Sequence, residues 1–473
     1  MTAPPNVLWV VWDTVRAQNM SVYGYERPTT PHLEEWAQGA RVFENAVSAA
    51  SITTTSHASM FTGLLPFEHA VGNGHSRLAP SFQTVAEVLS GAGYRTYLFS
   101  ANPYLGPETA LDRGFQVSER PTSPPFERDF ARHREQKVRD YLRAGRAAED
   151  FRFLAASGSL AQDGLLAWLE RSAGDAPFFA VLNYMEAHLP LAPERRFRER
   201  FMTPEQVKRS LESPLHGLPV WTFTTGVAEL SEDEIEIARR VYDAAIAELD
   251  ELFRDLLVEL EQRDLLDDTL VILTSDHGEL LGEHHMWNHQ YALYEELLHV
   301  PLILHGPGHV TPGRDPRPVM NLDLFRTVLE LAGSEVPGPG ARGVSLLAPV
   351  ASRVRLSEYT HPAGLFLELV KRKHPEFDEA LFDRSLRALR SGGLKYIWAS
   401  DGRHELYDLG MDPGEGDDLA AERRAQAERL GEELHRLTEA GAAAKGTAEA
   451  AQFDAQTRVM LEALGYAADG EER

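Results

Sequence analysis

Uninterrupted apolar runs, each about as long as a single β-strand, recur along the chain and alternate with segments of helical pattern. Such runs predict strands buried on both faces of a sheet. They lie at residues 6–12, 41–47, 94–99, 177–185 and 271–273, and a further run ends near Leu304. Expected helices cover residues 31–38, 82–89 and 321–332, and a capping box at residues 231–234 opens a long amphipathic helix to about Arg263. The alternation predicts an α/β fold.

The pattern changes after a Pro/Gly-rich linker at residues 337–343. Two short β-like runs, 394–399 and 405–408, precede an expected helix at 419–440, which fits a small α+β unit. We therefore divide the chain into a main domain of residues 1–343, a carboxyl-terminal α+β subdomain of residues 344–440, and a tail of residues 441–473 with a short helical pattern. Within the main domain, residues 121–230 are expected to form a helical and irregular insertion, irregular from 195 to 230.

Composition restricts the function. The chain has 473 residues with 47 Lys+Arg against 72 Asp+Glu, a net charge of −25, which argues against nucleic acid or an anionic membrane as the main partner. Cysteine is absent, so there is no disulfide, thiolate ligand or cysteine nucleophile. The amino terminus lacks a basic region, and no segment reaches about 18 apolar residues. We expect a cytoplasmic protein without a membrane span, whose tail could dock on its own body or on a second subunit of a homo-oligomer.

Charged and imidazole side chains follow the predicted strands at their carboxyl ends. Asp13 follows the first run, Glu186 and His188 follow the run at 177–185, and Asp276 and His277 follow the run at 271–273. Open α/β sheets keep their chemistry at this edge. Carboxylate oxygen and imidazole nitrogen suit Mg²⁺, Mn²⁺ or Zn²⁺. Each strand end alone could be a polar turn, so the prediction of a metal site depends on their convergence.

Residues 51–63, SITTTSHASMFTG, begin with hydroxyl side chains and continue as a helix-compatible run. A helix amino terminus offers N–H groups and positive dipole to an anion, so Thr53 here would face a phosphate or sulfate, although capping alone is the alternative. A divalent cation held by Asp13, Asp276 and His277 would bind the Thr53 hydroxyl, lower its pKa and polarise an ester oxygen. Thr53 would then attack phosphorus or sulfur.

With these residues, the sequence resembles the sulfatase family of the alkaline phosphatase superfamily, from Asn6 to about Gly465. The resemblance implies an alkaline phosphatase-like mixed sheet between helices for the main, catalytic domain, and a small domain with its own antiparallel sheet. The motifs that carry it include Val10-Val11-Trp12-Asp13-Thr14-Val15-Arg16, Ser56-His57-Ala58-Ser59-Met60-Phe61-Thr62-Gly63, Glu186-Ala187-His188, Ser275-Asp276-His277-Gly278-Glu279 and Glu405-Leu406-Tyr407-Asp408-Leu409.

Departures from the family pattern bear on the substrate. Family sulfatases convert a Cys or Ser to formylglycine, and this chain has Thr53 at that position, from which formylglycine cannot be made. A second Asp and two lysines of the family pattern are replaced by Thr14, Asn102 and His289. Those lysines neutralise a sulfate, so their loss weakens the interpretation as a sulfatase. The remaining set resembles the metal site of phosphoglycerol transferases and other phospho-ester-cleaving relatives, which use the Thr directly.

The resemblance also implies residue roles. Asp13, Thr53, Asp276 and His277 carry over as metal ligands, with Thr53 also the nucleophile. His188 and His289 carry over as contacts of the substrate anion or as leaving-group acids, with Asn102 as a further substrate contact. His57 stands where the family Arg steadies the nucleophile. A second metal on Glu186, His188 or His289 ranks below a one-metal site.

We therefore predict a metal-dependent hydrolase that cleaves phosphate mono- or diesters through a covalent Thr53 intermediate. Its cofactor would be one divalent metal, with Mn²⁺ or Mg²⁺ favoured over Zn²⁺ or Ca²⁺ and no formylglycine, and its partner a small anionic ester. The first alternative is a sulfate-ester hydrolase that works without formylglycine. The second alternative is a non-catalytic family member that binds an anionic ligand.

Overall fold

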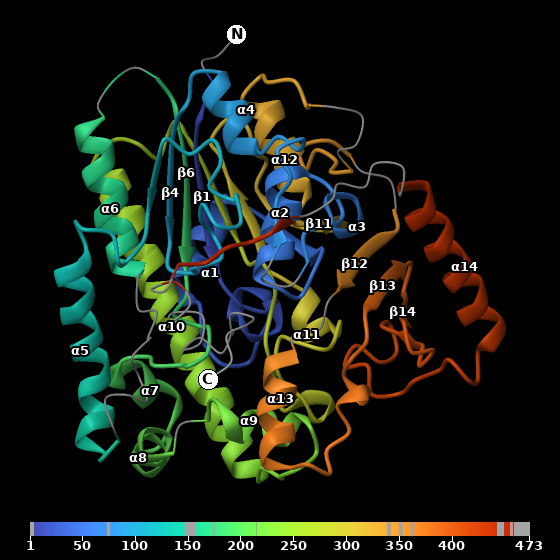
Figure 1. The fold of residues 1–473 in the computed structure, drawn as a ribbon. Coiled ribbons are helices and arrows are strands. Elements are labelled where there is room, and N and C mark those ends of the chain that lie inside the picture. Colours follow the sequence, from blue (N-terminus) through green and yellow to red (C-terminus); the bar gives the residue numbers. More distant parts are fainter. Residues whose placement is uncertain are drawn as a thin grey trace.

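The computed structural model describes residues 4–72, 76–146, 158–172, 174, 176–213, 215–337, 342–349, 353–360, 364–441, 449–454 and 457. An eight-stranded mixed sheet forms its centre (Figure 1). In spatial order its strands are β11 (Gly313–Met320), β2 (Arg41–Val47), β10 (Leu302–His305), β7 (Thr269–Thr274), β1 (Asn6–Trp12), β6 (Phe178–Tyr184), β4 (Arg95–Ser100) and β5 (Val117–Glu119). The run from β7 to β5 is parallel, whereas β10 is antiparallel to both of its neighbours.

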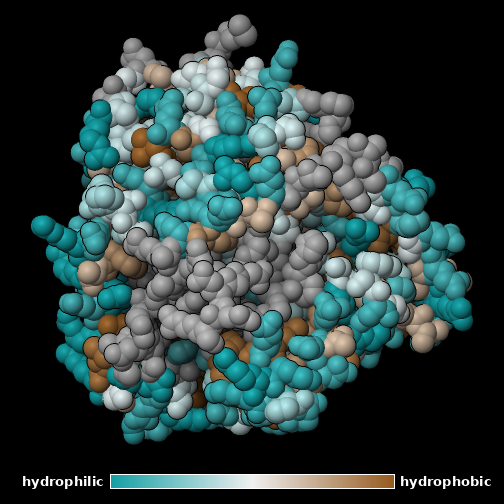
Figure 2. All heavy atoms as spheres, in the orientation of Figure 1, coloured by the Kyte–Doolittle hydropathy of each residue, from teal (hydrophilic) through white to brown (hydrophobic). Residues whose placement is uncertain are grey.

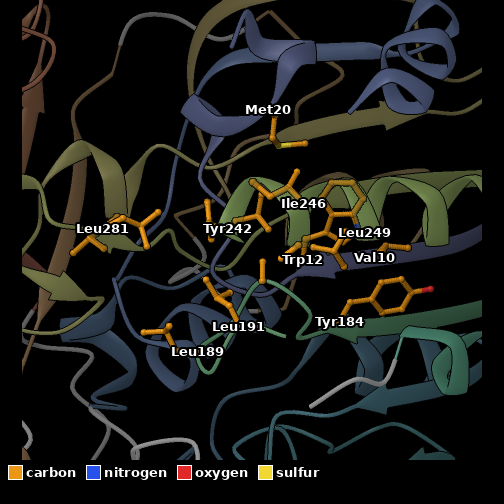
Figure 3. Close-up of a cluster of buried hydrophobic side chains, with 14 of the residues drawn as sticks. Val10, Trp12, Met20, Tyr184, Leu189, Leu191, Tyr242, Ile246, Leu249 and Leu281 are labelled. Atoms are coloured by element: carbon orange, nitrogen blue, oxygen red, sulfur yellow. The ribbon is translucent and has the colours of Figure 1, made fainter. Parts of the chain in front are cut away.

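The side chains of β1 alternate between two hydrophobic cores, one on each face of the sheet. Leu8, Val10 and Trp12 join the larger core, whereas Val7, Trp9 and Val11 join the second core on the opposite face. Figure 3 shows Val10 and Trp12 packed beside Tyr242, Ile246 and Leu249 of the long helix α10 (Glu232–Glu261). A strand buried on both faces needs an apolar residue at every position, which explains the uninterrupted run in the sequence.

Helices cover both faces of the sheet (Figure 1). The larger core contains residues of α10 and α6 (Gly158–Arg171), and the second core contains residues of α2 (Thr53–Thr62), α4 (Val85–Gly91) and α12 (Asp323–Leu331). The other helices of this part are α1 (Pro31–Trp36), α3 (Pro66–His69), α5 (Glu127–Arg143), α7 (Arg195–Phe201), α8 (Pro204–Glu212), α9 (Leu218–Thr224) and α11 (Glu295–Leu298). The fold is thus the predicted α/β class, with a mixed sheet between helices.

The carboxyl-terminal part contains a second sheet, which is four-stranded and antiparallel. Its strands are β12 (Arg355–Tyr359), β13 (Leu386–Ser391), β14 (Leu394–Ala399) and β15 (Glu405–Asp408), in that order, and α13 (Gly364–Lys373) connects the first two. Helix α14 (Arg424–Gly441) packs its Leu430 and Leu434 against Leu389 and Tyr396 of this sheet. The prediction of a small α+β unit is confirmed, as Figure 1 shows at the right.

Several expected boundaries were wrong. Residues 195–230, expected to be irregular, contain α7, α8 and α9, because Pro204 and Pro219 occupy the first turns of α8 and α9, where proline is tolerated. The sequence pattern identified only β14 and β15, and it missed β12 and β13, whose arginines interrupt the apolar pattern. The last helix begins at Arg424 instead of 419. The range 121–230 also includes β6, in the middle of the main sheet.

The remaining expectations concern the surface and the tail. On the face drawn in Figure 2, hydrophilic residues cover most of the described surface, and hydrophobic groups are small and scattered. No described helix is both long and apolar enough to cross a bilayer. The helical pattern expected near residues 456–464 lies almost wholly outside the described residues, as does the centre of the linker at 337–343.

Candidate metal centre and nucleophile

The strand register brings three separate strand ends to one edge of the sheet. Strand β1 pairs in parallel with β6, Trp12 opposite Tyr184, and with β7, Val11 opposite Thr274. Asp13, which follows β1, and Asp276 and His277, which follow β7, are therefore neighbours. Their side chains are fully buried, and one ligand atom from each lies within 4.8 Å of the others. The predicted convergence of Asp13, Asp276 and His277 is present in the structure.

Hydrogen bonds hold one oxygen of each carboxylate in this cluster. Asn102 and Asn183 donate to Oδ2 of Asp13, at 3.0 and 3.2 Å. The backbone N–H groups of Thr14 and His277 donate to Oδ1 of Asp276, at 3.3 and 2.9 Å. The other two oxygens, Oδ1 of Asp13 and Oδ2 of Asp276, are buried and accept no hydrogen bond from the residues that the structure describes.

The tautomer of His277 follows from its other contact. Its Nδ1 lies 3.0 Å from the carbonyl oxygen of Gly278, which can only accept, so Nδ1 carries the proton. Nε2 therefore presents its lone pair to the cluster, 3.4 Å from Oδ2 of Asp276. A backbone carbonyl that fixes the tautomer in this way is typical of a metal-ligating histidine.

Thr53 is the first residue of α2, and its hydroxyl lies inside the cluster. Oγ1 is 3.2 Å from Nε2 of His277 and accepts a hydrogen bond of 3.3 Å from the amide of Asn102. Ile52 occupies the cap position without a side-chain hydrogen bond, so Thr53 is not the residue that caps the helix. The structure therefore does not support capping, the alternative role for the Thr53 hydroxyl.

His57 lies one turn further along α2, and its ring lies next to the same cluster. Its Nδ1 donates to the carbonyl oxygen of Thr53 at 3.0 Å and is 3.7 Å from Oδ2 of Asp276. This contact attaches the ring to the backbone of the residue that carries the hydroxyl. His57 thus contacts the backbone of Thr53, and its role in steadying a nucleophile stays a prediction.

Two more predicted histidines lie beside the cluster. The ring of His289 is 4.5 Å from that of His277 and 5.4 Å from that of His188, between ring centroids. Nδ1 of His188 donates to the carbonyl oxygen of Leu189 at 2.6 Å. Glu186 turns away, because its Oε1 accepts a hydrogen bond of 2.8 Å from the backbone of Gly158 at the start of α6. Among the described residues, only Asp13, Asp276 and His277 form a group with metal-ligand spacing.

Burial shifts the pKa values of these groups toward their neutral forms. It raises the pKa of Asp276 to about 7, and together with the negative charge of Asp276 it raises the pKa of Asp13 to about 6. It lowers the pKa of His277 and of His188 to about 4, and of His57 and His289 to about 3. Desolvation by burial, which disfavours the charged form, is the largest cause in each case.

The donor set fits a divalent cation. Two buried carboxylate oxygens that accept no hydrogen bond from the described residues and one imidazole lone pair belong to three residues whose ligand atoms lie within 4.8 Å of one another. A cation bound by these residues would supply a positive partner for both carboxylates. Oxygen and nitrogen donors without sulfur suit Mn²⁺, Mg²⁺ or Zn²⁺.

Two residues of the site were not predicted. Asn183 is the penultimate residue of β6 and donates to Asp13, and its position inside an otherwise apolar strand was the available signal. Glu279 follows Gly278 in the loop after β7, and its Oε1 is 3.4 Å from Nδ1 of His289. Burial raises the pKa of Glu279 to about 8.

Comparison with known proteins defines the class of this site. The family model described as "Sulfatase" matches residues 5–334, and the model of the carboxyl-terminal region of N-sulphoglucosamine sulphohydrolase matches residues 282–440. The chain belongs to the sulfatase family, and it is a hydrolase that acts on ester bonds. Membership implies an anionic ester as substrate.

Curated relatives match along most of their length. A choline-sulfatase of Rhizobium meliloti (strain 1021) is 26% identical over 90% of this chain and 85% of its own. Human arylsulfatase K is 28% identical over 92% of this chain and 82% of its own.

Among solved structures, the phosphonate monoester hydrolase of Agrobacterium radiobacter superposes with a TM-score of 0.70 and 22% identity, covering 92% of this chain and 96% of its own. The phosphonate monoester hydrolase from Silicibacter pomeroyi gives a TM-score of 0.72 and 23% identity with the same coverage. These similarities confirm the fold.

Proposed function

We propose that this chain is a metal-dependent hydrolase of phosphorus esters in which Thr53 forms the covalent intermediate. The observation that carries the proposal is the position of the Thr53 hydroxyl, 3.2 Å from Nε2 of His277 inside the carboxylate cluster. An unactivated threonine is a weak nucleophile, and a group that lowers its pKa is required. Asp13, Asp276 and His277 would hold a divalent cation, which would supply that activation and polarise the ester, and Mn²⁺ and Mg²⁺ are the ions we favour.

The nature of the nucleophile favours phosphorus over sulfur. A formylglycine hydrate can expel sulfate by breaking its own C–O bond, but a threonine ester has no such route. Water must instead attack the phosphorus or sulfur atom of the intermediate. Hydrolysis of a phosphothreonine intermediate by water needs only the in-line geometry in which the intermediate formed. Thr53 is therefore suited to a phosphorylated intermediate.

The charge near the site favours an ester with a single negative charge. The ammonium groups of Lys137 and Lys395 pair with glutamates elsewhere, Lys137 with Glu248 and Lys395 with Glu295. Burial lowers the pKa of His188 and of His289, so neither ring adds a positive charge before an anionic ester binds. One divalent cation would balance the two aspartates, so little positive charge would be left for a dianion. We infer a preference for phosphodiesters or phosphonate monoesters over phosphate monoesters.

The residues would act in two steps. Thr53 would react as its alkoxide, having released its proton to solvent, and His289 or His188 would take up a proton from solvent when the anionic ester binds. Oγ1 then bonds to phosphorus, the ester P–O bond breaks, and that histidine gives its proton to the leaving oxygen. Water then attacks phosphorus, the same histidine takes the proton of that water, and the bond to Oγ1 breaks. His57 holds the backbone of Thr53 and Asn102 holds its oxygen throughout.

The test is a turnover assay on metal-stripped protein with Mn²⁺, Mg²⁺, Zn²⁺ or Ca²⁺ restored singly. The substrates are an aryl phosphodiester, an aryl phosphonate monoester, an aryl phosphate monoester and an aryl sulfate. We expect metal-dependent cleavage of the diester or phosphonate to exceed that of the sulfate by at least about tenfold, or about 1.4 kcal/mol in barrier. Faster cleavage of the sulfate would contradict the proposal.

Sulfate-ester hydrolysis without formylglycine is the second candidate. The family model and the similarity to a choline-sulfatase favour it. The same assay decides between the two, because the four esters share one leaving group and differ only in the atom attacked and its charge. Metal-independent binding of all four esters without turnover would instead indicate the non-catalytic alternative.

A further inference from the structure

Glu279 is a buried carboxylate that lacks the usual partners of a buried charge. Its side chain is fully buried, and neither of its oxygens accepts a hydrogen bond from the described residues. Arg16, the nearby cation, is directed elsewhere: it donates to the backbone carbonyl of Glu279 at 3.0 Å and pairs with Glu283 at 3.1 Å. Nδ1 of His289 lies 3.4 Å from Oε1 of Glu279.

We propose that Glu279 is a positioning residue, which binds Nδ1 of His289 and thereby directs Nε2 of that ring toward the leaving oxygen of the ester. The inference depends on the proposed function, in which His289 is a candidate leaving-group acid. Nδ1 and Nε2 lie on opposite sides of an imidazole, so a carboxylate bound to one nitrogen sets the direction of the other. The His277 ring, 4.5 Å from His289, limits how the His289 ring can rotate.

The surroundings of Glu279 match this role better than a role in stability. A buried carboxylate without hydrogen bonds costs free energy, whereas a loop residue kept only for packing would be neutral. The backbone of Glu279 is held by Arg16, and Arg16 is held in turn by Glu283 and by the ring of Tyr242. The side chain of Glu279 is therefore aimed by its backbone at His289.

In the proposed reaction, the pair works while the ester bond breaks. His289 gives its Nε2 proton to the leaving oxygen as the Oγ1–P bond forms and the ester P–O bond breaks. The proton at Nδ1 stays between the ring and Glu279. In the second step Nε2 takes a proton from the attacking water, which restores the starting state. Glu279 acts only through His289, so its loss should matter in proportion to the need for a proton on the leaving group.

The experiment measures leaving-group dependence with the metal-loaded protein. It compares a phenyl ester, whose leaving group resembles the tyrosine phenol with a pKa of about 10, with a 4-nitrophenyl ester that leaves readily without a proton. We expect Glu279→Gln to lower kcat for the phenyl ester by about 10- to 100-fold and for the 4-nitrophenyl ester by less than about 3-fold, with KM nearly unchanged. Glu279→Asp should keep more activity on the phenyl ester than Glu279→Gln does.

Two controls separate positioning from damage to the loop. His284→Asn removes an ionisable side chain of the same loop, one that contacts Glu296 and the ring of Tyr294 instead of Arg16 or His289. It should lower both rates by the same factor. In a His289→Asn background, Glu279→Gln should have no further effect, because a residue that acts through His289 has nothing left to position.

Equal losses on the two esters, or a full additional loss in the His289→Asn background, would overturn the inference. The ester class used is the one that the wild-type protein cleaves. If that class is a sulfate, the proposed function fails while the role of Glu279 is still decided, because sulfate esters need the same leaving-group proton. If no ester of any class is cleaved, both proposals fall.

Discussion

A threonine hydroxyl in water is a poor nucleophile, so the groups around Thr53 decide whether it reacts. The hydroxyl is fully buried and lies at the first residue of α2, where the helix dipole favours negative charge. The amide of Asn102 donates to Oγ1 and would stabilise an oxygen anion, whereas the lone pair of His277 Nε2 can accept the hydroxyl proton but would repel an alkoxide. A cation bound by both Nε2 and Oγ1 would remove that repulsion, so these surroundings favour an alkoxide only when a metal is bound.

Replacement of Thr53 should separate chemistry from structure. Thr53→Ala removes the attacking oxygen, and we expect kcat to fall by at least about 10³-fold, as expected for loss of a covalent nucleophile. Thr53→Ser keeps the oxygen and should retain activity within about 10- to 100-fold of wild type. The measurements are steady-state turnover and intact mass after rapid acid quench, which should show a phosphorylated protein for wild type and none for Thr53→Ala.

Thr54→Ala is the matched control for that pair. Thr54 is the next residue of α2 and is also fully buried, but its hydroxyl makes no hydrogen bond with the described part of the chain. Its replacement removes a hydroxyl of the same type from the same turn, and turnover should stay close to wild type. Near-full turnover of Thr53→Ala would exclude a covalent role for Thr53.

At the scale of single elements, helix α1 is capped from another helix. Its own cap residue, Thr30, makes no side-chain hydrogen bond to the helix. Asp250 of α10 instead accepts hydrogen bonds from the backbone N–H groups of His32 and Leu33, at 3.0 and 2.8 Å. A distant carboxylate thereby satisfies two donors that a short helix leaves unpaired.

This cap should make stability depend on pH. Burial raises the pKa of Asp250 to about 7, so the folded state keeps a proton that the unfolded state loses near its ordinary value of 3.8. The stability that this group contributes is therefore present at low pH and is lost as pH rises from about 4 to about 7, by up to about 1.4 kcal/mol for each pH unit between the two pKa values.

Urea unfolding of wild type and Asp250→Asn at pH 5 and pH 8 measures that dependence. Asparagine cannot ionise, so the free energy of unfolding of wild type relative to the variant should be smaller at pH 8 than at pH 5. Asp129→Asn, in an exposed i,i+3 pair with Arg132, serves as the control and should give the same difference at both pH values. A wild-type advantage that grows with pH would contradict the burial argument.

The central strands could be predicted from the sequence because a strand buried on both faces forms a continuous apolar run, as in Asn6–Trp12. Prolines were harder to interpret, since Pro204 and Pro219 begin helices instead of ending them. Strand β13 was missed because its arginines make ion pairs that no local pattern reveals, such as Arg390 with Glu295. Local pattern thus identifies elements whose burial is uniform and misses those stabilised by distant partners.

The same distinction applies to the candidate site, where some residues could be predicted from the sequence and others could not. Asp13, Asp276 and His277 could be predicted because parallel strands bring their carboxyl ends together. The pairing of Glu279 with His289 could not, because it depends on how the loop between residues 278 and 289 returns to the sheet. Glu186 was expected near the site, but its side chain faces α6, and sequence does not tell which way a residue after a strand turns.

At the scale of the whole molecule, a buried charge cluster joins the carboxyl-terminal sheet to the main body. Lys395 of β14 is fully buried, with its Nζ at 3.0 Å from Glu295 of α11 and 2.8 Å from Glu415. Arg390 of β13 also pairs with Glu295, at 2.9 Å. Although burial opposes its ionisation, Lys395 and Arg390 lower the pKa of Glu295 to about 2. Helix α11 follows the loop of His289, so this cluster also anchors the segment that carries the site.

Lys395→Met should therefore destabilise the protein far more than loss of a surface charge. It leaves two buried carboxylates facing one arginine, and breaking a buried pair by removing one partner costs about 3–5 kcal/mol. Protonation of Glu295 or Glu415 would relieve this repulsion, so the variant should recover part of its stability relative to wild type as pH falls from 7 to 5. Urea unfolding at both pH values is the measurement. Arg424→Ala, which removes the exposed partner of Glu428, should show no measurable change. A loss below about 1 kcal/mol for Lys395→Met, or one that deepens on acidification, would mean that the two sheets are held together by their apolar contacts and not by this cluster.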